Sequence, residues 1–340
     1  MIDDIRPVTW HDGAVRIIDQ TALPARLTYV DLTSVDELIA AIRRLAVRGA
    51  PALGVAGAYG VALALLRDDH DQIRDRIAAL RAARPTAVNL AAGVDRAAAR
   101  IDEGFDAVLE EAHAVLDEDL AANRTLSALG ADWLLARLED SGASTRRPLR
   151  LLTHCNAGAL ATAGCGTALG VVRELHARGL VEVVYVDETR PLLQGSRLTA
   201  WELARLGIPH LVQADSAAAS TIVTGHVDAA IVGADRVAAN GDTANKIGTL
   251  GVALACAHAG VPFLVAAPTS TVDLRTASGA DIHVELRDEA EVLGRAAPRE
   301  SRAHNPAFDV TPAALVSALT TERGVAEIAS GELPGSLWKP

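Results

Sequence analysis

The sequence has few cysteines, no dense basic run and no long apolar run. Its three cysteines, Cys155, Cys165 and Cys256, form no CxxC pair, so it indicates neither a disulfide framework nor a structural zinc site and fits a reducing cytosol. The formal net charge of −11 argues against binding to a nucleic-acid backbone or an anionic membrane. No apolar run reaches the ~20 residues of a membrane span, and the acidic start does not resemble a signal peptide. We therefore expect a cytoplasmic protein without nucleic-acid or membrane partners.

The first part of the chain is predicted to be mainly helical. Of the 340 residues, 50% are hydrophobic and 22% are charged, enough apolar content for two domains. Residues 10–32 alternate apolar and polar around the Asp12-Gly13 turn, which is typical of short antiparallel strands. Residues 34–138 have helical periodicity instead. We expect residues 1–140 to form a mainly helical domain with a short leading β unit, followed by an exposed connection over residues 139–150.

The second part of the chain alternates short apolar runs with helical stretches. The runs are LRLLTH (149–154), VEVVYVDE (181–188), PHLVQAD (209–215), DAAIVGAD (228–235) and PFLVAAP (262–268). Runs rich in β-branched residues, separated by helices, predict parallel strands joined by right-handed crossovers. We therefore expect an α/β fold class, with a Rossmann-like parallel-sheet domain over residues 150–340. The tail is expected to add one last extended piece.

In an open parallel sheet the ligands bind at the carboxyl ends of the strands, so the polar residues there are informative. Cys155 follows the first run and precedes a small-residue stretch that we predict to be a helix through Arg178. A helix N-terminus there would favour a thiolate by lowering the pKa of Cys155. The alternative is a small apolar core residue, which we favour for Cys165 and Cys256 because both lie inside helical patterns.

Asp235 is the first charged residue after the apolar run that ends at residue 234. A carboxyl group buried at a sheet edge can have a raised pKa and act as a proton donor. A cap of the next turn, or an ion pair with Arg236, explains the same residue equally well. Both interpretations stay open.

Three segments combine a cation with features that suit an anionic ligand. Arg48 precedes Gly49, Ala50 and a proline that predicts a helix start, where unpaired backbone N–H groups bind anions. The other two segments place Arg84 before a second proline-initiated helix, and Asn245 with Lys246 before a small-residue helix. A solvated surface charge is the alternative for each arginine.

Several common motifs are missing. The sequence contains no P-loop, HExxH, GxSxG or GxGxxG pattern, and the glycine-rich GCGTALG (164–170) is predicted to lie inside the helix after the first strand. A nicotinamide-dependent oxidoreductase and a metal site therefore lack support. His154 adjoins Cys155 and either polarises it or serves a structural role, since consecutive strand residues point to opposite faces.

Taken together and in this order, RGAPALG, LLTHCNAGALATAGCGTALG, VYVDETRPLLQGSRLTAWEL and IVGADRVAANGDTANKIGTLGVALA strongly resemble the methylthioribose-1-phosphate isomerase family. That family is related to the regulatory subunits of the guanine-nucleotide exchange factor of translation initiation. The resemblance covers nearly the whole chain. It implies a helical domain followed by a Rossmann-like domain, a homodimer, a sugar-phosphate substrate, and neither cofactor nor metal.

The resemblance also implies roles for individual residues. The catalytic residues would be Cys155 and Asp235. The substrate-binding residues would be Arg48, Gly49, Ala50, Arg84, Gln194, Asn245 and Lys246. Of these, Gln194 has no signal of its own beyond a polar loop.

The implied activity is the conversion of 5-methylthioribose 1-phosphate to 5-methylthioribulose 1-phosphate in methionine salvage. Isomerases of 5-deoxyribose 1-phosphate and, with less support, of ribose 1,5-bisphosphate are alternatives, because the bisphosphate needs a further cationic subsite near C5. A non-catalytic regulatory subunit is the alternative from a different class. Cys155 and Asp235 favour the enzyme, since a regulatory subunit has no chemical reason to keep both.

Overall fold

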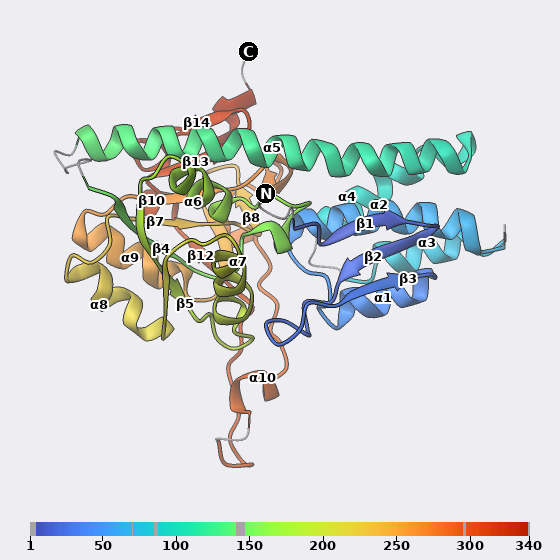
Figure 1. Ribbon diagram of the computed structural model, residues 1–340, viewed down its shortest axis with the longest axis horizontal. Coiled ribbons are helices and arrows are strands. Elements are labelled where there is room, and N and C mark those ends of the chain that lie inside the picture. The colour runs from blue at the N-terminus through green and yellow to red at the C-terminus, as the bar shows by residue number, and fades with distance from the viewer. Residues whose placement is uncertain (1–4, 70, 85–87, 141–146, 295–296, 339–340) are drawn as a thin grey trace. The chain divides into compact units, whose positions relative to one another are not determined.

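The computed structural model describes residues 5–69, 71–84, 88–140, 147–294 and 297–338 (Figure 1). The chain forms two compact units. The N-terminal unit comprises Met1–Arg124 and Ala157–Gly166, and the C-terminal unit comprises Thr125–Asn156 and Thr167–Pro340. The domain boundary expected between residues 140 and 150 stays a prediction, and residues 141–146 of that connection lie outside the described residues.

The N-terminal unit begins with the predicted antiparallel strands. They are β1 (Val8–His11), β2 (Ala14–Ile18) and β3 (Tyr29–Leu32), paired in the order β1-β2-β3. Asp12 and Gly13 have φ values of 47° and 75°, the left-handed conformation that a tight two-residue hairpin requires. The turn predicted from these two residues is confirmed.

A series of α-helices follows, as the periodicity predicts. They are α1 (Val35–Arg43), α2 (Ala50–Arg67), α3 (Ile73–Arg81), α4 (Val88–Ala98) and α5 (Phe105–Asp140), which continues into the C-terminal unit. Ser34 starts α1 with a capping box, in which its hydroxyl accepts from the Glu37 N–H and the Glu37 side chain reaches back.

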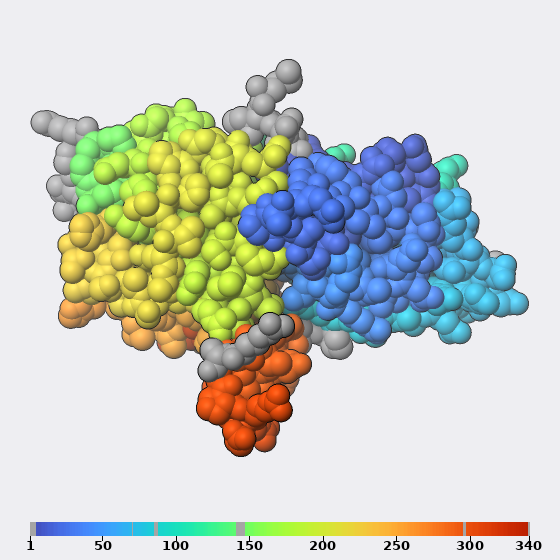
Figure 2. Space-filling view, turned by 60° about the horizontal axis from the view of Figure 1, so that its bottom comes forward, coloured from blue at the N-terminus to red at the C-terminus, as the bar shows by residue number. Residues whose placement is uncertain are grey.

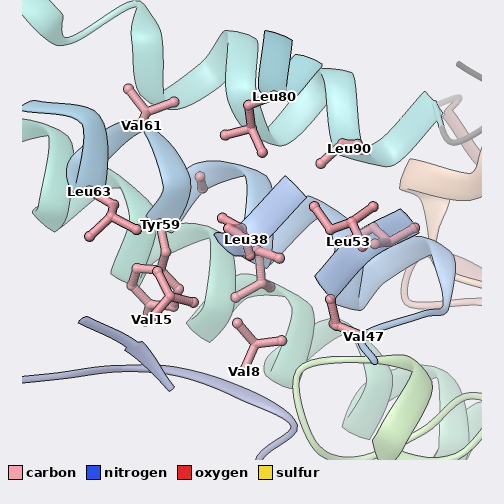
Figure 3. Close-up of a cluster of buried hydrophobic side chains, with 14 of the residues drawn as sticks. Val8, Val15, Leu38, Val47, Leu53, Tyr59, Val61, Leu63, Leu80 and Leu90 are labelled. Atoms are coloured by element: carbon pink, nitrogen blue, oxygen red, sulfur yellow. The ribbon is translucent and has the colours of Figure 1, made fainter. Parts of the chain in front are cut away.

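Helix α2 forms the centre of this unit. By length and composition it could cross a membrane, yet 72% of its apolar window is buried inside the protein. Figure 3 shows its Leu53 and Tyr59 packed with Val8 of β1, Leu38 of α1 and Leu80 of α3. Helix α2 is therefore apolar on all sides because it is a buried core helix.

The C-terminal unit contains a seven-stranded sheet in the order β14-β13-β10-β7-β4-β5-β6. All neighbours pair parallel except β14, which is antiparallel to β13. If the six parallel strands β4, β5, β6, β7, β10 and β13 are numbered 1 to 6 along the chain, their order in the sheet is 3-2-1-4-5-6, which is the doubly wound order. The direction of this order reverses between β4 and β7. The strands are β4 (Leu149–Thr153), β5 (Val181–Asp187), β6 (His210–Gln213), β7 (Ala229–Val232), β10 (Phe263–Ala266), β13 (Ala318–Thr321) and β14 (Gly324–Ala326).

The predicted parallel sheet is thus confirmed, with β14 as the extended piece in the tail. The helices α6 (Ala168–Ala177), α7 (Ala200–Arg205), α8 (Ala218–Val223) and α9 (Thr249–Ala259) lie between strands in the sequence. The prediction missed β13 and a second sheet in the order β11-β8-β9-β12. That sheet consists of β8 (Arg236–Ala238), β9 (Thr243–Lys246), β11 (Val272–Asp273) and β12 (Phe308–Thr311), and the segment around α10 (Ala290–Leu293) projects from the unit (Figure 2).

The helix predicted directly after Cys155 is wrong. Residues 156–167 form a loop with one 3₁₀ turn, and α6 begins only at Ala168. The backbone N–H groups of Gly164 and Gly166 donate to the Thr162 hydroxyl, an arrangement that competes with a helix. Residues 164–167 therefore lie in the loop that enters α6, and residues 168–170 lie in its first turn. The dinucleotide fingerprint still fails because Leu169 occupies the position of the third glycine.

Candidate active site

The reversal of strand order places two of the predicted residues after neighbouring strands. Strands β4 and β7 pair in parallel, with Leu151 opposite Ala229. Cys155 follows the end of β4 and Asp235 follows the end of β7. Because ligands of doubly wound sheets bind outside the carboxyl ends at such a reversal, this edge is the candidate active site.

Cys155 occupies a strained but well-anchored turn. Its φ is +67°, which is rare for a residue with a side chain, and the residue is 6% exposed. Its N–H donates to the Thr189 hydroxyl at 2.8 Å, and its carbonyl accepts from the Thr199 hydroxyl at 2.6 Å. Hydrogen bonds on both sides therefore fix this backbone, in place of the helix N-terminus that the sequence predicted.

Asp235 leads directly into the second sheet. Its N–H donates to the Ala244 carbonyl at 2.9 Å, so the β8–β9 hairpin brings it beside the Asn245-Lys246 segment. The side chain is exposed, so the burial on which the proton-donor prediction relied is absent. Arg236, its alternative partner, lies 3.9 Å from Asp273.

Asn245 and Lys246 lie just before the helix α9, as predicted. They end strand β9, and both are buried. The Asn245 amide donates to the Thr249 hydroxyl at 3.0 Å. The Lys246 ammonium donates to the Ala307 carbonyl at 2.7 Å and lies 4.6 Å from the centre of the Phe308 ring. These contacts hold a buried cation in a fixed position.

Gln194 is the residue that the sequence alone would not have found. It is 6% exposed, and its Oε1 is buried without a hydrogen-bond partner among the described residues. An unsatisfied buried carbonyl costs free energy unless a donor reaches it, so this atom is suited to a ligand hydroxyl. The structural signal is burial, which a polar loop sequence does not reveal.

The remaining predicted residues, Arg48, Gly49, Ala50 and Arg84, belong to the N-terminal unit. Helix α2 begins at Ala50 with a proline in its first turn, which confirms the predicted helix start. Gly49 has a φ of +98°, and a Cβ there would lie 2.3 Å from the Ala161 carbonyl oxygen. Both arginines are half-buried, and Pro85, the predicted start of the second helix, lies outside the described residues.

His154 has a structural environment. Its Nδ1 lies 3.0 Å from Asp187 Oδ2 and its Nε2 lies 2.8 Å from the Ile247 carbonyl oxygen. Burial lowers the pKa of His154, but the hydrogen bond and charge of Asp187 outweigh it, and the pKa is raised. Ligand atoms of His154, Asp187 and Asp215 lie within 4.8 Å of one another, as a metal site requires, yet both ring nitrogens are already engaged by protein oxygens.

Neither of the other two cysteines follows the end of a strand. Cys256 is buried inside α9, and burial raises the pKa of its thiol to about 12, which confirms the predicted core role. Cys165 is half-buried in the loop before α6, so its predicted helical position is wrong.

The fold and the strand ends define a doubly wound α/β protein with a candidate site at its strand reversal. Residues 46–328 match the model of the initiation factor 2 subunit family, and the chain belongs to this family.

Two curated relatives cover nearly all of the chain. A methylthioribose-1-phosphate isomerase of Anaeromyxobacter dehalogenans is 52% identical over 95% of this chain and 94% of its own length. A protein of Nocardia farcinica named "probable bifunctional methylthioribose-1-phosphate isomerase/methylthioribulose-1-phosphate dehydratase" is 53% identical over 98% of this chain. The chain spans only 61% of the length of that bifunctional relative.

Two solved structures have the same fold. The 5-methylthioribose 1-phosphate isomerase of Pyrococcus horikoshii has a TM-score of 0.85 and 38% identity, covering 95% of this chain and 92% of that one. The delta subunit of translation initiation factor eIF-2B from A. fulgidus has a TM-score of 0.82 and 40% identity, covering 95% and 96%. Structural similarity alone therefore does not separate an isomerase from a translation factor.

Proposed function

We propose that the protein is an aldose–ketose isomerase that converts 5-methylthioribose 1-phosphate to 5-methylthioribulose 1-phosphate, a step of methionine salvage. One observation carries the proposal. A cysteine and an aspartate, the two groups that the chemistry needs, follow the neighbouring strands β4 and β7 at the strand reversal. Full-length relatives named for this activity support it.

The substrate explains why an acid and a base are both required. Phosphate blocks the anomeric oxygen, so the ring cannot open to a free aldehyde before isomerisation. We propose that Asp235 protonates the ring oxygen as its bond to C1 breaks, while the Cys155 thiolate takes the proton from C2 to form an enol. The thiol returns the proton to C1, and the C2 hydroxyl gives its proton to Asp235 as the ketone forms.

Substrate binding is proposed for the residues that the family resemblance names. The cations Arg48, Arg84 and Lys246 would bind the phosphate through charge-assisted hydrogen bonds. Gln194 Oε1 would accept from a sugar hydroxyl, which would satisfy its buried carbonyl. The remaining proposed binding residues are Gly49, Ala50 and Asn245.

A hydride shift from C2 to C1 is the rival chemistry, with Cys155 only shaping an apolar environment. Substrate deuterated at C2 separates the two. Substantial loss of deuterium to solvent supports proton transfer, whereas complete retention in the product is the outcome of either a hydride shift or a proton that is fully shielded from solvent.

The function is tested by steady-state turnover of 5-methylthioribose 1-phosphate, with the ketose identified by NMR. We expect turnover without added cofactor or metal. Turnover of 5-deoxyribose 1-phosphate alone would assign the alternative substrate. No turnover of either would contradict the proposal and favour ribose 1,5-bisphosphate or a regulatory role.

The regulatory alternative has one specific observation in its favour, the similarity to the eIF-2B delta subunit. It predicts that the protein stays inactive on every sugar phosphate tested and that Cys155→Ser changes no binding property. We favour the isomerase because Cys155 is held in a strained turn by two hydrogen bonds, an arrangement that suits a reacting group.

We further propose that the protein is a cytoplasmic homodimer. Cys155, Cys165 and Cys256, all among the described residues, form no disulfide with one another, which suits a reducing compartment. Sedimentation or light scattering at micromolar concentration tests the dimer, and a mass equal to one chain would contradict it.

A further inference from the structure

His154 is enclosed by oxygen acceptors. The ring is 1% exposed, with Asp187 Oδ2 at Nδ1 and the Ile247 carbonyl at Nε2. A carboxylate and a carbonyl can only accept hydrogen bonds. A neutral imidazole carries one N–H and would leave one of these contacts without a proton, whereas an imidazolium satisfies both.

The charges around the ring favour the protonated form. Carboxylates face it from three elements: Asp187 at the end of β5, Asp215 in the turn before α8, and Asp309 of β12. The Gln213 amide donates to Asp187 Oδ1 at 2.8 Å, which leaves Oδ2 directed at His154. A buried cation surrounded by carboxylates retains its proton more strongly than a solvated one.

The ring also connects the turns that carry the proposed site. His154 precedes Cys155, Ile247 follows Lys246, and Asp187 lies two residues before Thr189, which accepts from the Cys155 N–H. The ring packs on Gly248, where a Cβ would lie 2.7 Å from Cε1 and where φ is +107°. The contact is therefore close, and only glycine fits there without a shift.

We propose that His154 is a protonated positioning residue, whose two N–H groups hold the turn of Cys155 in register with the turn that follows Asn245 and Lys246. It acts through Cys155 and touches no reacting atom. The kinetic part of this inference rests on the proposed isomerase function.

The protonation state is tested without substrate. In protein labelled with ¹⁵N at histidine, the His154 ring should still show two protonated nitrogens at a pH above the ordinary histidine pKa of about 6.5. His258, exposed on α9, is the internal control. A His154 ring with only one protonated nitrogen at such a pH would overturn the inference.

The positioning role is tested with His154→Gln, matched by His258→Gln. We expect kcat to fall by about 10²-fold in His154→Gln, the scale of a small misplacement of a reacting group, with KM within a few-fold. The control should equal the unmodified protein. A kcat for His154→Gln that also equals the unmodified protein would refute positioning.

Asp187→Asn provides a second variant if His154→Gln fails to fold. Without the carboxylate, burial dominates and His154 should lose its proton at a lower pH. Since the protonated ring is the active form, kcat should fall with rising pH through a step that the unmodified protein lacks. A profile parallel to that of the unmodified protein would overturn the inference.

Failure of the proposed function is distinguishable from failure of this inference. If no sugar phosphate is turned over, the NMR result still reports the protonation of His154. The rate of Cys155 alkylation by iodoacetamide, read by peptide mass spectrometry, should then change in His154→Gln and not in His258→Gln. Unchanged alkylation in both variants would contradict the positioning role.

Discussion

Gly49 offers a sharp test of how the RGA segment (residues 48–50) is held, because a close contact and an unusual backbone conformation coincide at this residue. Its φ is 98° and its ψ is 137°, and a Cβ would lie 2.3 Å from the Ala161 carbonyl oxygen and 2.5 Å from the Ala161 Cα. Both residues belong to the N-terminal unit. Gly49→Ala must therefore both strain its own backbone and displace that of Ala161.

Gly104 is a matched control. Its φ of 93° and ψ of 179° are similarly unfavourable for alanine, but within the described part of the chain no atom lies within 4 Å of the place that a Cβ would take. Backbone strain alone should cost about 1–3 kcal/mol in either variant. The collision at Gly49 should add about 1–3 kcal/mol, the typical cost of forcing a methyl group into packed structure.

The free energy of unfolding, measured in urea, tests this difference. We expect Gly49→Ala to lose about 2–6 kcal/mol and Gly104→Ala about 1–3 kcal/mol. Equal losses in the two variants would refute the contact between the RGA segment and the loop after Cys155.

Three further predictions follow from single residues or from the substrate. Burial opposes ionisation of Asp228, but hydrogen bonds from Arg147 and Arg150 outweigh it and lower its pKa. Asp228→Asn should therefore be less stable near neutral pH. The difference in thermal midpoint should begin to narrow below about pH 4, where the unfolded-state carboxyl protonates, and should close as the pH falls through the lower native pKa. A difference that persists at lower pH would contradict this. Alkylation of the native protein near pH 8 should spare Cys256, whose thiol has a pKa of about 12, and rapid labelling in peptide mass spectra would contradict its burial. The values of kcat/KM for the methylthio and deoxy substrates should differ by about 10–200-fold, the effect of a small apolar group, and a ratio near one would show that C5 is not contacted.

The parallel sheet was predictable because buried strands in such sheets read as short apolar runs. The five runs from Leu149 to Ala266 are all strands, and the Asp12-Gly13 turn follows from local backbone preference. Strand β13 was missed because its sequence, ALTT, is short and mixed. The second sheet is equally short, with strands of two to four residues whose pairing depends on distant partners.

The candidate site was predictable where polar residues end strands, and less so where tertiary contacts decide. Cys155 and Asp235 stand out by position, but the sequence of the loop after Cys155 looks helical because its alanines have high helix propensity. Tertiary hydrogen bonds, such as the one from the Gln20 amide to the Leu160 carbonyl, hold it in another shape. The burial of Gln194 Oε1 likewise depends on residues that the local sequence does not identify.

The proposed acid–base pair is tested by turnover of 5-methylthioribose 1-phosphate by Cys155→Ser and Asp235→Asn, beside Cys165→Ser as a control thiol. We expect kcat to fall by at least about 10²-fold in each of the first two variants, as it does on removal of a general acid or base, and to stay unchanged in the control. Full activity in Cys155→Ser or in Asp235→Asn would contradict the proposed acid–base pair.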